Sequence, residues 1–212
     1  MTPSIPHGRA SATVLIVVAA VAAAFGLWLG TRSADRTALP EFRAAVAYPA
    51  PRSLPEFSLS RSDGTPLTLA DWKGHWTVAF FGFTHCPDIC PTTLATFKQA
   101  WNQLDPATRA RVRFDFISVD PQRDTPELLH AYVSYFNPEF VAATGSDAEL
   151  TRLTRALGLL YTRGASTDGN YSVDHSASAV IIDPDGRQAG LFRPPFEAAP
   201  IAADLAALAG TR

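Results

Sequence analysis

The stretch HWTVAFFGF (75–83) is an almost unbroken run of apolar and aromatic residues. A run this short and this apolar is typical of a central strand buried on both faces of a sheet. Both cysteines of the chain, Cys86 and Cys90, follow directly in THCPDICP, where the strand gives way to a helix. Because α/β folds place their chemistry at the ends of such strands, the sequence predicts a functional site here.

The rest of the soluble part alternates strands with helices. A β-hairpin is expected over 54–74 around the turn SDGTP, and further strands over 112–120 and 139–145. Apolar spacing and N-terminal capping residues predict helices over 92–104, 124–136, 146–159 and 198–210, with a strand–turn–strand unit over 177–192 before the last helix. This order predicts an α/β domain with a mixed central sheet flanked by helices.

Residues 11–30, SATVLIVVAAVAAAFGLWLG, contain no charged side chain. As a helix they would reach ~30 Å, the hydrocarbon thickness of a bilayer. We expect a retained transmembrane anchor with residues 1–10 in the cytoplasm. A cleaved signal peptide is the alternative, although the run is long for one. A core helix is disfavoured, because it would be apolar all round.

Residues 31–53 mix small residues, charges and prolines and are expected to form a tether to a domain over 54–212. Either an anchor or a signal peptide puts this domain outside the cytoplasm, where two cysteines can cycle between thiol and disulfide. The expected location is the bacterial inner (plasma) membrane, single-pass, with the soluble domain on the periplasmic side. A net charge of -2 gives no general attraction to nucleic acid, so no nucleic-acid partner is expected.

Prolines define the cysteine loop. Pro91 belongs in the first turn of a helix, and the residue before a proline avoids the α region, so 86–90 should form a tight loop leading into that helix. Such a loop can close a disulfide or aim both sulfurs at one metal ion. The helix start would lower the thiol pKa of Cys90. A purely structural disulfide would stabilise little in so short a loop.

A metal site needs a further ligand, and five histidines are available. His7 precedes the apolar segment, His75 lies on a charged turn where we expect it to be solvated, and His130 is expected on an exposed helix face. His85 adjoins Cys86 and would point to the opposite face of an extended chain. His175 precedes the strand of 177–192, where it can face the cysteines if that strand lies beside 75–83; a surface histidine remains the alternative.

Two thiolates and one imidazole favour Cu(I) and can also hold Cu(II). Zinc would require a fourth ligand, for which Asp88 or water is a candidate.

The segments FGFTHCPDICPTTL, ISVDPQRDTPE and YSVDHSASAVIIDPDG together resemble the Sco/SenC family of membrane-anchored, thioredoxin-like copper proteins that assist assembly of cytochrome c oxidase. The resemblance implies a thioredoxin-like fold over 54–208. It implies copper ligation by Cys86, Cys90 and His175, with Cys86 and Cys90 also forming a redox disulfide. It further implies a copper donor protein and oxidase subunit II, with its dinuclear copper centre, as partners.

Three functions remain open. A metallochaperone is expected to need all three ligands. A thiol–disulfide oxidoreductase acting on cysteines of the oxidase subunit or other extracytoplasmic proteins would need only the cysteines, although thioredoxin-type exchangers space theirs by two residues, not three. A peroxidase of the peroxiredoxin kind is disfavoured, because Thr84 lies two positions before Cys86 instead of three.

Overall fold

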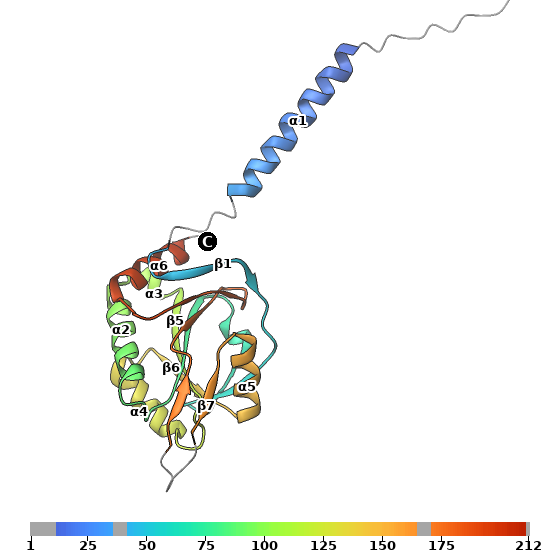
Figure 1. Ribbon diagram of the computed structural model, residues 1–212. Helices are drawn as coiled ribbons and strands as arrows, with labels where there is room; N and C mark the ends of the chain where they lie inside the picture. Colours follow the sequence, from blue (N-terminus) through green and yellow to red (C-terminus); the bar gives the residue numbers. More distant parts are fainter. Residues whose placement is uncertain (1–11, 36–41, 165–170, 211–212) are drawn as a thin grey trace, which may run out of the picture. The chain divides into compact units, whose positions relative to one another are not determined.

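An eight-stranded mixed sheet organises the part of the chain that follows residue 41 (Figure 1). The computed structural model describes residues 12–35, 42–164 and 171–210. Strand order is β1-β10-β9-β4-β5-β6-β2-β3. The strands are β1 Ala45–Arg52, β2 Ser58–Arg61, β3 Pro66–Thr68, β4 Trp76–Gly82, β5 Val112–Ser118, β6 Val141–Thr144, β9 Ala179–Ile182 and β10 Gln188–Phe192. A separate two-stranded sheet joins β7 Tyr161–Arg163 to β8 Val173–His175.

The predicted central strand is β4, and all seven of its residues are buried. It pairs in parallel with β5 and antiparallel with β9, so the predicted mixed sheet is confirmed. The pairing of β2 with β3 confirms the hairpin around SDGTP. The β7–β8 pair was not predicted, because strands of three residues are too short for a periodicity to show.

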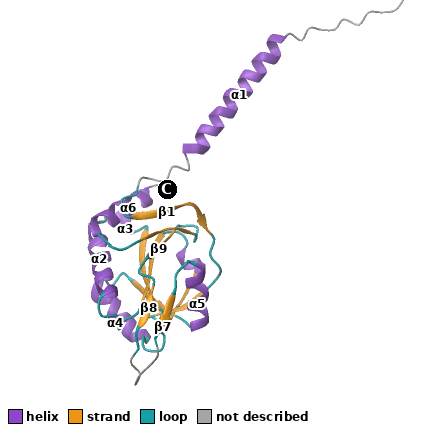
Figure 2. Ribbon diagram, in the orientation of Figure 1, coloured by secondary structure: helices purple, strands orange, loops and turns teal. Residues whose placement is uncertain are grey.

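Helices cover both faces of the sheet (Figure 2). They are the 3₁₀ helix η1 Leu69–Trp72 and the α-helices α2 Ile89–Gln103, α3 Pro106–Arg109, α4 Pro126–Phe136, α5 Asp147–Ala156 and α6 Ala198–Gly210. Successive side chains of β4 point to opposite faces of the sheet, because a β-strand is pleated. Phe80 belongs to the core that includes residues of α2, α4 and α6, whereas Phe81 belongs to the core that includes residues of η1 and α5.

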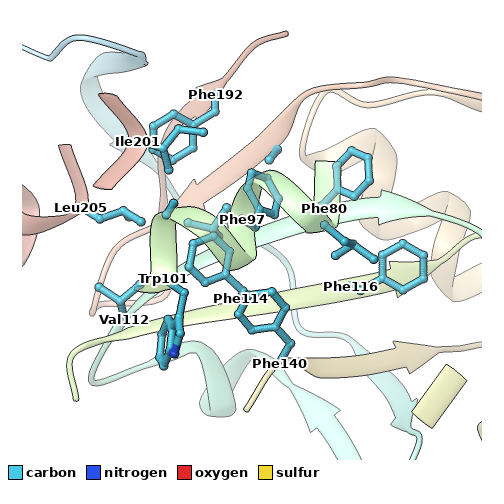
Figure 3. Packing of buried hydrophobic residues seen from close by; sticks show 14 of the residues in the cluster. Phe80, Phe97, Trp101, Val112, Phe114, Phe116, Phe140, Phe192, Ile201 and Leu205 are labelled. Carbon is cyan, nitrogen blue, oxygen red and sulfur yellow. The ribbon is translucent and has the colours of Figure 1, made fainter. Parts of the chain in front are cut away.

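Aromatic rings fill the first of these cores (Figure 3). Phe97 of α2 lies 5.1 Å from Phe114 of β5, between ring centres, and 6.1 Å from Phe80 of β4. Phe114 in turn contacts Phe140 at 5.0 Å. This packing fixes the start of α2 against the end of β4, where both cysteines lie.

The prediction of a tether over 31–53 is wrong for residues 45–52. They form β1, which pairs antiparallel with β10, so the domain begins well before residue 54. Pro49 and Pro51 suggested a linker, but an edge strand tolerates proline because one side of it makes no ladder bonds. The close approach of β1 also explains Gly190: a Cβ there would lie 2.5 Å from the Val46 carbonyl oxygen.

The N-terminal residues form a separate unit, Met1–Pro40, which contains α1 Ala12–Asp35. Residues 31–35, predicted to belong to the tether, are therefore helical. Side chains of residues 14–28 are exposed. Among the residues that the structure describes, no helix is both long enough and apolar enough to cross a membrane. The segment 1–10, which is predicted to be cytoplasmic and contains His7, lies outside the described residues, which begin at residue 12.

Candidate metal centre

The cysteine loop runs from the end of β4 into the first turn of α2, as the prolines predicted. Asp88 is the N-cap of α2, Cys90 is its second residue and Pro91 its third. Proline is tolerated there, because the first turn of a helix has no partner for its N–H groups. The Cys90 backbone N–H donates a hydrogen bond of 3.4 Å to Cys86 Sγ, which folds the loop back on itself.

Cys86, Cys90 and His175 converge. Their ligand atoms all lie within 4.8 Å of one another, and Cys90 Sγ is 3.5 Å from His175 Nε2. Both cysteines are free thiols. The meeting follows from the sheet order: β9 is antiparallel to β4, so the chain entering β9 lies beside the chain leaving β4. The sequence placed His175 near the cysteines only if the strand that follows it lies beside the strand of 75–83, and this pairing is confirmed.

His175 is oriented by its neighbours. Its Nδ1 lies 3.1 Å from the Ser176 carbonyl oxygen, so a proton on Nδ1 donates there and leaves the Nε2 lone pair facing the sulfur. The rings of Phe80 and Phe83 meet the imidazole edge-on at 5.9 and 6.0 Å. Burial in this aromatic surrounding lowers the pKa of His175, which keeps the ring neutral and able to bind a metal.

Cys90 corrects one expectation. Its position at a helix start predicted a lowered thiol pKa, but the side chain is fully buried and burial raises the pKa of Cys90. Desolvation of the thiolate outweighs the helix dipole, whose effect on one charge is modest. A metal ion that takes this sulfur as a ligand therefore has to displace its proton.

The other candidate ligands lie outside this group. His85 is exposed and contacts Thr84 Oγ1 at 3.1 Å. Asp88 is exposed and accepts a hydrogen bond from Thr92. His130 is exposed on α4, as predicted. His75 was expected to be solvated but is partly buried, with Nε2 2.9 Å from Arg113 Nη1.

The sequence did not reveal the carboxylate beneath the cysteine loop. Asp124 is 1% exposed and accepts hydrogen bonds from the Thr84 backbone N–H, the Thr84 hydroxyl and the Ser118 hydroxyl. It thereby joins the end of β5 to the residues before Cys86. In the sequence it stands beside Thr125, the N-cap of α4, and resembled a second capping residue.

A second group, built on Asp120 and Arg123, to which the family resemblance gives a supporting role, holds the chain that leads to His175. The Arg123 guanidinium lies 3.8 Å from the centre of the Tyr171 ring and donates a 3.0 Å hydrogen bond to the Tyr171 carbonyl oxygen. Asp120 accepts hydrogen bonds from Arg123 and from the Tyr171 hydroxyl. We call residues 171–175 the histidine arm.

Two of the three ligand residues border an open groove of about 750 Å³. Cys86 and His175 line it, together with the apolar side chains of Phe83, Pro87 and Ile89. The Ile89 side chain is 48% exposed at the rim. The groove leaves Cys86 and His175 accessible to another molecule, whereas the Cys90 side chain is fully buried.

Comparison with known proteins agrees with this geometry. A profile of the SCO1/SenC family matches residues 46–210. The mitochondrial SCO2 homolog of Bos taurus is 35% identical over 184 residues, 85% of this chain and 69% of that protein. The solution structure of apo Sco1 from Thermus thermophilus superposes with a TM-score of 0.73 and 34% identity, over 81% of this chain and 99% of that one.

The copper-bound ScoI of Bradyrhizobium japonicum superposes with a TM-score of 0.66 and 33% identity, over 74% of this chain and 99% of that one. The thioredoxin-like fold predicted by the resemblance is confirmed by these superpositions. With a profile match that spans nearly all of the sheet-forming unit and relatives alike in both sequence and fold, the chain belongs to the SCO1/SenC family.

Proposed function

We propose that this protein is a copper chaperone that carries one copper ion between the thiolates of Cys86 and Cys90 and the imidazole of His175. The observation that carries the proposal is the convergence of these three ligand atoms within 4.8 Å. Copper is the cargo here, held for transfer to another protein. The copper-bound relative from Bradyrhizobium japonicum supports this choice of metal.

The donor set favours copper over zinc. Two sulfurs and one imidazole suit Cu(I) and can also hold Cu(II), whereas a structural zinc site is closed by four ligands. Within the described residues, no further His, Cys, Asp or Glu joins the three. A three-ligand site that opens on a groove leaves a position where the ligand of a partner can attack, as transfer of a cargo ion requires.

The proposed partners follow from family membership. They are an upstream copper donor protein and subunit II of cytochrome c oxidase, whose dinuclear copper centre would receive the ion. We further propose that the charge-free segment 11–30 anchors the protein in the bacterial inner membrane, with the folded unit on the periplasmic side. Release of the protein from membranes by high salt alone would contradict this anchoring.

Thiol–disulfide exchange is the second candidate function. The hydrogen bond from the Cys90 N–H to Cys86 Sγ places both sulfurs on one tight loop, within reach of a common partner. In this reaction the two thiols reduce a disulfide of the partner to two thiols and become the Cys86–Cys90 disulfide themselves. That disulfide cannot act as a pair of thiolate ligands, so oxidation would release or exclude copper.

Metal analysis of the reduced protein tests the proposal. Under anaerobic conditions, Cu(I) should bind at about one ion per chain in the parent and in the His130→Ala control, which changes an exposed histidine of α4. His175→Ala should lose tight binding, because one of three ligands is gone. If His175→Ala binds Cu(I) as tightly as the parent, the assigned centre is wrong. A variant that loses copper but retains disulfide reduction would favour the second function.

A further inference from the structure

A second hollow, of about 270 Å³, lies beside the open groove of the metal centre. Asp174 and His175 line both, so the two hollows meet at the histidine arm. Leu160 lines the second hollow. Its backbone N–H donates to Ser176 Oγ at 3.0 Å, and its carbonyl oxygen accepts from the Ser176 N–H at 2.9 Å. These two hydrogen bonds fix Leu160 beside the candidate ligand His175.

Each hollow carries one large apolar side chain that water can reach. Leu160 in the second hollow is 73% exposed, and Ile89 in the groove is 48% exposed. Single exposed apolar side chains are normal on a protein surface, but these two flank the accessible ligands Cys86 and His175. An apolar segment of another protein that covered them would gain the free energy of removing both from water.

Carboxylates border the same surface. Asp174 is exposed and lines both hollows, and Asp88 is exposed next to the groove residue Ile89. Among the described residues, no lysine or arginine lines either hollow. Arg163, which is close to the second hollow in the chain, is already paired with Asp147 at 2.6 Å. The two exposed carboxylates are therefore available to cationic groups of another molecule.

We propose that the two hollows and the histidine arm form the docking surface for a partner protein, and that the docking segment of this partner combines apolar side chains with lysine or arginine. The apolar side chains cover Leu160 and Ile89, and the cationic ones lie against Asp88 and Asp174. Opposite charges across such a surface speed association and disfavour partners of the wrong charge. The proposal rests on the proposed function, because it names the chemistry of the partner that meets the same centre.

Reactive peptides test this surface without copper. The peptides are Leu-Lys-Leu-Lys, Leu-Gln-Leu-Gln and Ser-Lys-Ser-Lys, each with a bromoacetyl group at the N-terminus and an amide at the C-terminus. The Cys86 sulfur displaces bromide and forms a carbon–sulfur bond, and the thiol proton goes to the solvent. The full chain is used reduced and metal-free in detergent, and mass spectrometry confirms that the adduct is on Cys86. Ratios of rate constants between peptides cancel any change in the reactivity of the sulfur itself.

The first ratio reports charge. At low ionic strength the parent should react about fivefold faster with Leu-Lys-Leu-Lys than with Leu-Gln-Leu-Gln, and salt above about 0.5 M should abolish the difference. Asp174→Asn and Asp88→Asn should each lower this ratio about twofold. Asparagine is as good an N-cap as aspartate, so Asp88→Asn keeps the start of α2. Glu56→Gln, the control, removes an exposed carboxylate that lines neither hollow and should leave the ratio unchanged.

The second ratio reports apolar contact. The parent should react faster with Leu-Lys-Leu-Lys than with Ser-Lys-Ser-Lys, and Leu160→Gln should lower this ratio about twofold to threefold, because less apolar area is covered. Leu128→Gln is the matched control, since Leu128 is 38% exposed on α4 and lines neither hollow. Both side chains are exposed, so neither change should lower the melting temperature markedly.

Equal rates with the three peptides would overturn the proposal, and so would a failure of Cys86 to react with any of them. The same holds for a charge preference that Asp88→Asn and Asp174→Asn both leave intact. A rate constant that falls as the protein concentration rises would show that a second copy of the chain covers the surface, against the proposal. If the parent binds no copper, the chaperone function fails, but the peptide rates still decide the docking surface.

Discussion

Gly82 and Cys90 show how single residues set the properties of the centre. The absence of a side chain at Gly82 makes room for the Cys90 sulfur at the end of β4. Because the sulfur then lies fully inside the core, its thiol pKa is raised, against the effect of the helix start. The chemistry of Cys90 is therefore decided by its packing more than by its place in the chain.

Gly82→Ala should destabilise the fold by about 1–3 kcal/mol, the usual cost of overpacking a core. The new Cβ would lie 2.6 Å from Cys90 Sγ and 2.9 Å from Phe116 Cε2, so one or both must move. Urea denaturation measures the effect. In a Cys90→Ala background the same change should cost less, because one of the two clashes is gone. Equal costs in both backgrounds would show that the sulfur is not in the way.

His75 should make stability depend on pH. Burial first, and then the positive charge of Arg113, lower the pKa of His75, so the folded protein holds this ring neutral. The unfolded chain binds the proton below about pH 6.5, so this contribution is full above that pH and is lost as the pH falls. The slope stays below about 1.4 kcal/mol per pH unit, because a single imidazole binds at most one proton.

His75→Gln provides the comparison, since its amide oxygen can accept from Arg113 and does not titrate. The free energy of unfolding, measured between pH 7.5 and pH 5, should fall more steeply in the parent than in His75→Gln. Parallel curves for the two proteins would contradict the assignment.

At the scale of elements, the centre depends on the histidine arm, residues 171–175. The arm is held at one end by Arg123 and Asp120, through Tyr171, and at the other by β7, since Tyr161 pairs with His175. Asp120 and Arg123 follow β5, whereas the cysteines follow β4, its parallel neighbour. One edge of the sheet therefore supports both the cysteine loop and the arm.

Tyr171→Phe should loosen the arm at the cost of about 1 kcal/mol, because Asp120 loses a hydrogen bond from the phenol. Hydrogen exchange reports this locally: the Gly164 N–H, which donates to the Ser172 carbonyl oxygen at 2.9 Å, should exchange faster. Tyr161→Phe is the control, since its hydroxyl contacts Thr151 of α5 and not Asp120. Equal exchange in parent and Tyr171→Phe would mean that the phenol does not hold the arm.

For the molecule as a whole, β1 ties the start of the folded unit to its end. The buried carboxylate of Asp204 on α6 accepts hydrogen bonds from the backbone N–H groups of Arg43, Ala44 and Ala45, at 2.9, 2.8 and 2.8 Å. β1 also supplies the outer partner of β10. The first described residues of the folded unit are thus fastened to its last helix.

A chain that starts at residue 41 should therefore keep the stability of the folded unit, whereas one that starts at residue 54 should not. The shorter chain leaves the Asp204 carboxylate buried without its three donors and uncovers the edge of β10, a loss of at least about 2 kcal/mol. Denaturant midpoints of the two chains provide the measurement. Matching midpoints would restore residue 54 as the start of the domain.

The sequence by itself determined the local elements. The apolar run of β4, the capping residues of α4 and α5, the SDGTP turn and the prolines beside Cys86 and Cys90 each act within a few residues, so their effect can be predicted without the fold. The resemblance to the Sco/SenC family rested on such short segments too.

Only the tertiary structure decided which distant residues meet. His175 reaches the cysteines because β9 runs antiparallel beside β4, β1 joins the sheet because an edge next to β10 is free for it, and the Cys90 pKa rises because a core closes over the sulfur. Strand order and burial arise from contacts between residues far apart in the chain. The periodicity of apolar residues along the chain does not predict these contacts.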